Sequence, residues 1–266
     1  DVLSRERIYF IRKAETSDPT YQAALTAALA VRGETALARA GLLPNLSFQA
    51  GIAGNSHDIE VAPGAFGTNG RQSFDSENFE FRAEQPLFRY DRWLKLKQVD
   101  RRIAQAEAEV AAVHADLVMK VSERYINVLG FQAEVKNSQA ALDALLSQMN
   151  QTIPRYELGV ATEADLPEAQ ADSDPAAAEL IKAQSNVYVA IDALEELTGE
   201  APHIANEFSD ELVLPPINPD GIGEWERLAA EQNAAVLAAE MQIEIARYDR
   251  NIAKSGHLPT VGLIGK

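Results

Sequence analysis

The sequence of 266 residues contains no cysteine. This absence excludes a disulfide framework, a zinc–cysteine site and a cysteine nucleophile. There is also no apolar run near the roughly 20 residues that a membrane-spanning helix requires, so any membrane crossing would have to be made by strands. Aromatic residues make up only 7% of the chain, and alanine dominates its apolar residues. Such a composition favours long, closely packed helices over a globular α/β core.

Basic charge is scarce. The chain has 24 lysines and arginines against 40 acidic residues, which gives a formal net charge of −16. This balance argues against nucleic acid or anionic lipid as a partner that binds through a basic face. The charge is typical of a well-solvated surface, and an acidic passage that favours cations is the alternative interpretation.

Motifs that carry catalytic chemistry are missing as well. The four histidines fall on different predicted elements and include no pair at the spacing of metal ligands: His57, His114, His203 and His257. There is no glycine-rich phosphate loop and no nucleophile elbow. We therefore predict that the chain is not an enzyme, has no catalytic residues, and binds no cofactor and no metal.

A segment occurs twice, at residues 10–48 and 225–263, with an offset of 215 residues that places Pro44 on Pro259. Identical residues at matched positions include Arg12/Arg227, Ala14/Ala229, Arg32/Arg247, Ala38/Ala253, Gly41/Gly256 and Leu43/Leu258. Each copy is an amphipathic helix that ends at glycine, followed by Leu-Pro and an alternating run. The repeat predicts one supersecondary unit used twice in a pseudo-symmetric body.

The first copy begins with two predicted helices and continues into strands. A helix over 3–17 should break at Asp18–Pro19, and the next should run to Ala40 with Gly41 as its C-cap. From Pro44 apolar and polar residues alternate, which predicts strands over 44–56 and 73–85 around a loop at 55–72. One face of these strands is apolar and the other charged. Alternation alone is compatible with a membrane sheet or a soluble sandwich.

The longest predicted element is a helix over residues 94–150. Apolar residues spaced by seven form an a/d seam: Val99, Ile103, Ala106, Val110, Val113 and Leu117. A tight turn follows at 155–162, with Thr162 as the N-cap of a second, antiparallel helix that ends near Leu197. Pro175 should break or kink this helix near 172–175, with Asp174 as the cap of the restart.

Several short motifs in this order resemble the TolC family of outer-membrane efflux proteins. They are Leu-Pro at both helix–strand junctions, QPLF at 85–88, RYELGVAT at 155–162, ALEELTG at 193–199 and SGHLPT at 255–260. The resemblance covers essentially the whole chain. Two alternatives are a periplasmic adaptor with a coiled-coil hairpin and a soluble coiled-coil scaffold without a channel.

The resemblance implies a passive exit duct in the outer membrane of a Gram-negative bacterium that extends into the periplasm. Three copies would contribute strands to one β-barrel, and their long helices would form a tunnel. Such ducts work with a periplasmic adaptor (membrane-fusion) protein and with an inner-membrane pump or ABC exporter. The sequence ends before the fourth strand and second hairpin of the family, so we expect it to be truncated.

The expected fold is mainly α with a membrane β part: a long antiparallel coiled-coil hairpin, strands of a trimeric barrel, and an internal repeat. In chain order, the expected parts are a first helical pair (1–43), two barrel strands with an exposed loop (44–86), a long α-hairpin (87–198), an equatorial connector (199–224), the helix of the second repeat (225–257) and the start of a third barrel strand (258–266).

Two sets of site residues follow from this mapping. Side chains expected to line the channel are Ser47, Gln49, Glu80, Arg82 and Glu84, and those expected to face lipid are Phe48, Ile52, Phe79 and Phe81. The hairpin tip expected to dock an adaptor comprises Arg155, Tyr156, Leu158, Gly159 and Thr162.

Overall fold

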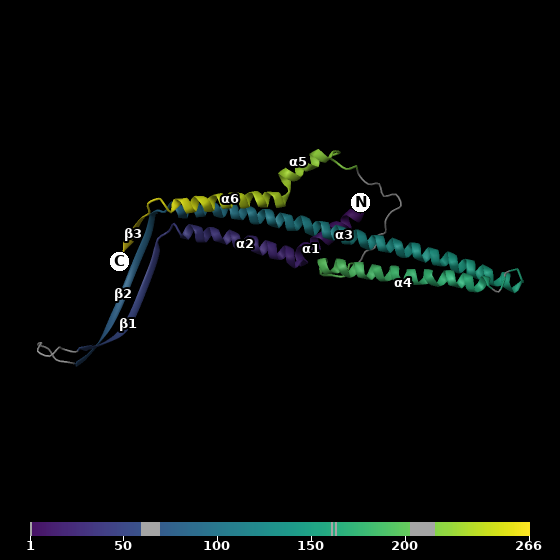
Figure 1. Ribbon diagram of the computed structural model, residues 1–266, viewed down its shortest axis with the longest axis horizontal. Coiled ribbons are helices and arrows are strands. Elements are labelled where there is room, and N and C mark those ends of the chain that lie inside the picture. Colours follow the sequence, from purple (N-terminus) through teal and green to yellow (C-terminus); the bar gives the residue numbers. More distant parts are fainter. Residues whose placement is uncertain (1, 60–69, 161, 163, 203–215) are drawn as a thin grey trace. The chain divides into compact units, whose positions relative to one another are not determined.

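The computed structural model describes residues 2–59, 70–160, 162, 164–202 and 216–266. Its elements in chain order are α1 (Val2–Ser17), α2 (Pro19–Ala40), β1 (Asn45–Ile59), β2 (Gly70–Phe88), α3 (Tyr90–Glu157), α4 (Asp165–Thr198), α5 (Ile222–Gln232), α6 (Ala234–Ser255) and β3 (Val261–Gly265) (Figure 1). The fold is mainly helical. Among the described residues, no helix combines the length and apolarity needed to cross a membrane.

The chain forms two compact units, and α3 contributes to both. The first unit contains Asp1–Ala28 and Ala106–Ala238. Its core is made where α1, α3 and α4 meet, and it consists of Phe10, Ala14, Leu117, Val121, Tyr125, Val128, Leu129, Ala190, Leu194 and Leu197. The ring of Phe10 lies 5.7 Å from that of Tyr125 between centroids, so aromatic packing adds to the burial of aliphatic side chains.

Helices α3 and α4 form the long hairpin (Figure 1). At 1.5 Å per residue, the 68 residues of α3 extend roughly 100 Å. All six residues of the predicted seam on α3 are buried or half-buried. One face of α4 is buried at intervals of three, four or seven residues, at Ala169, Ser173, Leu180, Ala183, Ala190, Leu194 and Leu197. This spacing on α4 is that of a coiled-coil seam. The predicted seam on α3 lies before Arg124, which contacts the Ala193 carbonyl near the end of α4.

The predicted break near 172–175 is wrong. Helix α4 continues through Pro175 without interruption. Pro175 is exposed, while Ser173 before it and Leu180 after it are buried on the same face. Continuous packing across the proline compensates for the single backbone hydrogen bond that it removes. Helix α3 likewise includes Pro154 and ends at Glu157.

The second unit contains Leu29–Gln105 and Ala239–Lys266. It holds a three-stranded antiparallel sheet in the order β1-β2-β3. The ladder between β1 and β2 runs from Asn45↔Glu84 to Ile59↔Gly70. Both strands are thus longer than predicted, because residues 55–59 and 70–72 pair in the sheet and do not belong to a loop. The rest of the predicted loop, 60–69, lies outside the described residues.

The two copies of the repeat form the same local structure. After α2, Leu42 and Leu43 donate backbone hydrogen bonds to Arg39 and Ala40, and residues 257 and 258 bond to 254 and 255 in the same way after α6. Gly41 follows α2 as predicted but does not have a positive φ. The repeat also extends to the N-cap positions, which are occupied by Asp18 and Asn233.

Asp18 Oδ1 accepts a hydrogen bond from the Tyr21 N–H at 2.7 Å, which confirms Asp18 as the cap of α2. Asn233 Oδ1 accepts from the N–H groups of Ala235 and Val236 at 2.9 and 3.3 Å. The single helix expected over 225–257 is therefore wrong: Asn233 has an extended backbone and separates α5 from α6.

Candidate channel wall and hairpin tip

The five residues expected to line a channel lie on one face of the β1–β2 ladder. Ser47 is opposite Arg82, and Gln49 is opposite Glu80. Glu84, opposite Asn45, lies two residues along from Arg82. Side chains of directly paired residues share a face, and so do those two residues apart on a strand. The sheet thus brings all five polar side chains together.

Opposite charges are interleaved on this face. Arg82 Nη2 lies 3.8 Å from Glu84 Oε2. Lys266 Nζ lies 3.9 Å from Glu80 Oε1. These side chains are 39 to 66% exposed, so each pair adds little to stability. Their effect is to keep a charged, hydrated face on this part of the sheet.

The other face carries large apolar side chains that the protein itself does not cover. Phe48 pairs with Phe81, and Phe79 lies beside them opposite Ala50. The three phenylalanines are 68, 58 and 67% exposed, and Ile52 on the same face is 79% exposed. A cluster of this kind on a soluble surface would be a liability, whereas lipid can cover it.

The hairpin tip is a helix-ending turn built around one glycine. Gly159 has φ +69°. Its N–H donates to the Tyr156 carbonyl at 2.9 Å, and the Val160 N–H donates to the Arg155 carbonyl at 2.8 Å. These two bonds form a Schellman motif, which satisfies the last carbonyls of α3 and needs a left-handed residue at Gly159.

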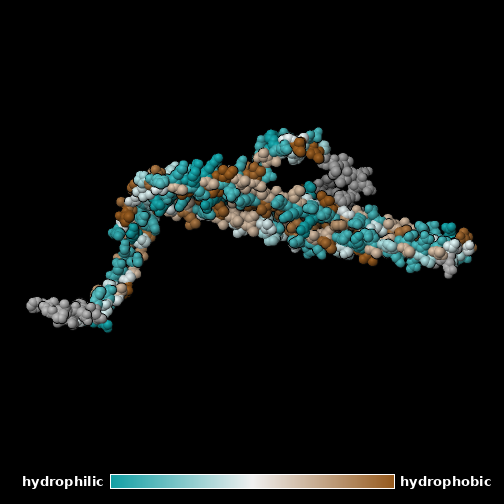
Figure 2. All heavy atoms as spheres, viewed as in Figure 1, coloured by the Kyte–Doolittle hydropathy of each residue, from teal (hydrophilic) through white to brown (hydrophobic). Residues whose placement is uncertain are grey.

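The tip exposes apolar side chains (Figure 2). Leu158 is 78% exposed, Val160 67% and Tyr156 44%. Of the predicted tip residues, Arg155, Tyr156, Leu158 and Gly159 lie in or beside the turn. The exposed apolar side chains lie on the turn that these two hydrogen bonds form.

Thr162 is not the N-cap of α4. The helix begins at Asp165, and its capping position is Ala164, which makes no side-chain cap bond. Thr162 is nevertheless bound to the first residue of the helix, since the Thr162 N–H donates to Asp165 Oδ2 at 2.6 Å. This hydrogen bond from Thr162 lowers the pKa of Asp165.

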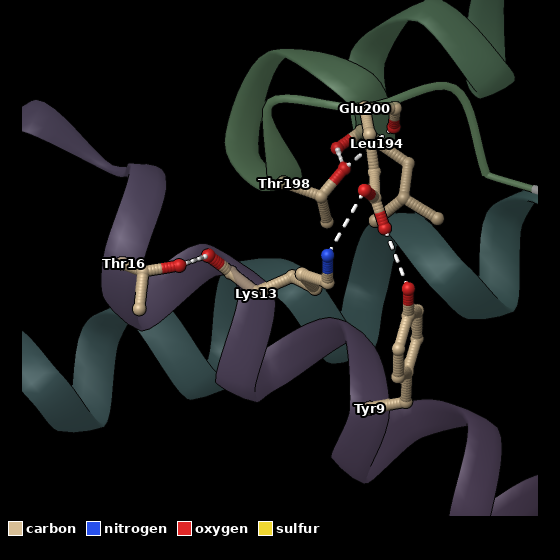
Figure 3. A network of polar contacts seen from close by, with 6 residues as sticks. All are labelled: Tyr9, Lys13, Thr16, Leu194, Thr198 and Glu200. Carbon is tan, nitrogen blue, oxygen red and sulfur yellow. Dashed lines mark hydrogen bonds and ion pairs between the residues drawn. The ribbon is translucent and has the colours of Figure 1, made fainter.

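A polar network near the end of α4 was not predicted (Figure 3). Tyr9 Oη donates to Glu200 Oε1 at 2.6 Å, and Lys13 Nζ donates to Glu200 Oε2 at 3.0 Å. The hydrogen bond from Tyr9, followed in size by the one from Lys13, lowers the pKa of Glu200. The network joins α1 to the residue that follows the hairpin. No local sequence signal could have found it, because its partners are 187 and 191 residues apart.

Gly199 makes the turn between α4 and Glu200 possible. Its φ is +73°, and a Cβ added there would lie 2.9 Å from Ser17 Oγ. Both the left-handed backbone and the close approach of α1 therefore require glycine. Thr198 Oγ1 lies 3.0 Å from the carbonyl oxygens of Leu194 and Glu200, which ties the last turn of α4 to Glu200, two residues after its end.

No group of three or more potential metal ligands occurs among the described residues. His114 lies 2.8 Å from a single carboxylate, that of Glu15, and its ring packs at a tilt against that of Tyr21 with 5.5 Å between centroids. This is a packing contact between helices. The arrangement offers surfaces that could contact lipid, water and other proteins.

The structure combines a long helical hairpin with a sheet that has one polar face and one exposed apolar face. The sequence matches the family model for "Outer membrane efflux protein" over residues 10–200, which is more than half of the chain. The chain belongs to this family. It is an outer-membrane protein of Gram-negative bacteria. Members of the family are transport channels and not enzymes.

Relatives and solved structures agree with this assignment. The chain is 27% identical over 227 residues to outer membrane protein TolC of Vibrio cholerae, covering 85% of this chain and 50% of that protein. It is 25% identical over 249 residues to the alkaline protease secretion protein AprF of Pseudomonas aeruginosa, covering 93% and 52%. A membrane protein from Pseudomonas aeruginosa shares the fold with a TM-score of 0.79 at 21% identity, covering 98% and 60%. The chain spans about half the length of the curated relatives it matches.

Proposed function

We propose that the chain is part of the channel subunit of a tripartite efflux or type I secretion system, a passive duct across the outer membrane and periplasm. The observation that carries the proposal is the pair of strands with five polar side chains on one face and exposed phenylalanines on the other. The names of the relatives support it, since AprF and PrtF are named for protease secretion and TolC for the outer membrane.

In this proposal three copies contribute their strands to one β-barrel. Closing a sheet is the way in which strands satisfy every backbone hydrogen bond in lipid, and it removes the free edges of β1 and β3. The face with Glu80, Arg82 and Glu84 then lines a water-filled lumen, and Phe48 and Phe79 contact lipid. The charged face would be expensive in lipid, which sets the direction of the assignment.

The hairpin tip is the proposed docking site for a periplasmic adaptor, which connects the duct to an inner-membrane pump or ABC exporter. Leu158 and Val160 supply exposed apolar area, and Arg155 and Thr162 supply polar contacts at its edge. The periplasmic adaptor and soluble scaffold alternatives are not favoured, because the matching family and relatives are outer-membrane proteins.

Cysteine accessibility tests the channel wall. Because the sequence has no cysteine, Gln49→Cys and Phe48→Cys can each be introduced singly in the full-length protein in outer membranes. A membrane-impermeant maleimide should label Gln49→Cys and leave Phe48→Cys unlabelled. If only the Phe48→Cys site reacts, the face assignment is wrong. Heat-resistant trimers in detergent extracts of the same membranes are expected, and extraction as a soluble monomer would contradict the channel.

A further inference from the structure

Gln98 is a buried polar residue whose two side-chain N–H groups both donate hydrogen bonds to one neighbouring helix. It lies on α3 and is 4% exposed. Its Nε2 donates to the Ile245 carbonyl at 3.2 Å and to Asp249 Oδ1 at 2.6 Å, both on α6. An amide group has two N–H donors, so this group is saturated by α6. The bond to the carboxylate is the short, charge-assisted one.

This arrangement determines how α6 sits on α3. Ile245 and Asp249 are one helical turn apart on the same face of α6. Displacing α6 by one residue would move its groups about 1.5 Å along the axis and turn them by about 100°. Both acceptors would then be out of reach of Gln98, whose Nε2 would remain buried without a partner, an unfavourable state. The contact therefore selects both the axial position and the rotation of α6.

The same helices lead directly into the sheet. Helix α3 follows β2 after Arg89, and α6 leads to β3 through the turn at Gly256–Leu258. Pairing between β2 and β3 begins at an irregular place. The register shifts between Pro86 and Phe88, and Pro86, opposite Gly262, has no N–H to donate. The start of β3 is therefore weakly specified by the sheet itself.

Strand β1 provides an internal comparison. Position 34 is the repeat equivalent of position 249, and Glu34 on α2 is bound by Arg102 Nη1 of α3 at 3.2 Å. Both side chains of that pair are about 40% exposed, so it is a weak contact. The ladder of β1 with β2 has no register shift from Asn45 to Ile59, whereas that of β2 with β3 has one between Pro86 and Phe88.

We propose that Gln98 is a positioning residue that sets the register of β3 on β2 through α6. In the structure Gln85 is opposite Leu263, and Glu84 is opposite Ile264. A slip of one residue would exchange the faces of Leu263 and Ile264, because side chains alternate along a strand. Gln98 thereby decides which side chain of the third strand shares the face of Glu80 and Glu84. The inference concerns packing within this chain and does not depend on the proposed function.

Disulfide cross-linking reads the register directly. In the full-length protein, Gln85→Cys is combined with Leu263→Cys (the observed register) or with Ile264→Cys (the slipped register). A disulfide needs Cα atoms about 4.4–6.8 Å apart with suitable Cβ directions, which directly paired residues provide. Under mild oxidation the observed-register pair should cross-link at least about tenfold more than the slipped pair. Adding Gln98→Leu should reduce this preference to about threefold or less.

Variants of Asp249 test the same hydrogen bond without a substitution at the buried Gln98. Asp249 is exposed, so Asp249→Leu should fold even if Gln98→Leu does not. Asp249→Leu should lower the preference, whereas Asp249→Asn, which keeps an Oδ1 acceptor, should retain it. The inference is overturned if Asp249→Leu keeps the tenfold preference, or if Asp249→Asn loses it as fully as Asp249→Leu.

Discussion

Replacing Pro175 with alanine should stabilise α4. Pro175 is the eleventh residue of the helix, and it is exposed, so the substitution removes no packing. It restores an N–H that can donate to the carbonyl of Ala171. An interior proline costs about 3 kcal/mol relative to alanine. Because Ala171 is also exposed, water can bind its carbonyl and reduce the difference, and we expect a gain of about 1–3 kcal/mol.

Native-state amide hydrogen exchange in the full-length protein measures this gain where it arises. Amides of α4 on either side of residue 175 should exchange about 5- to 150-fold more slowly in Pro175→Ala, which corresponds to the expected free energies. Amides in those turns of α3 that lie away from Pro175 provide the internal reference. The measurement reports local opening and needs no assumption about global unfolding of the assembly.

Pro167→Ala is the matched control. Pro167 is the third residue of the same helix, where an N–H has no acceptor within the helix. We expect a change under about 0.5 kcal/mol there. If Pro175→Ala leaves exchange unchanged or faster, α4 does break at this point in solution. Asp174 would then act as the cap of a second helix, and the account of continuous packing would be refuted.

Two further substitutions test the end of the hairpin. The hydrogen bonds of Tyr9 and Lys13 lower the pKa of Glu200 from 4.5, so their contribution to stability is present above that value and is lost as pH falls through the folded pKa. Glu200→Gln should therefore flatten the fall in melting temperature between about pH 6 and pH 3, and coinciding profiles would contradict the link. Gly199→Ala should destabilise by at least about 1–2 kcal/mol through its left-handed φ, with an added clash against Ser17. Ser17→Ala removes the contact with Oγ and leaves that with the Cβ of residue 17 at 3.1 Å, so it should relieve part of the clash in a double-mutant cycle, and additivity would contradict the close approach.

Local chemistry predicted much of the fold, because its signals are contained in short stretches of chain. The Asp18–Pro19 cap, the heptad seam and the alternation after Pro44 each depend on neighbours a few residues away. The repeat offset also placed a cap-forming residue, Asn233, opposite Asp18. The single helix expected over 225–257 did not take this capping signal into account.

The sequence predicted which residues form the candidate channel wall, but not which residues of β1 and β2 lie opposite each other. Alternation separates Gln49 from Phe48 on any strand, since successive side chains point to opposite faces. Which residue of β2 lies opposite each of them depends on the register, and a shift of one residue would place Phe81 beside Gln49. Only the paired sheet joins Ser47 to Arg82 and Gln49 to Glu80.

The sequence by itself determined where most helices and strands occur, the Asp18 cap and the family, because propensity, periodicity and motif spacing are local properties. The tertiary structure alone decided three things: that packing along the hairpin carries α4 through Pro175, that Glu200 meets Tyr9 and Lys13, and that Gln98 bonds to Asp249. Each depends on segments far apart in the chain, and the free energy of such contacts appears only when burial brings them together and removes water between them.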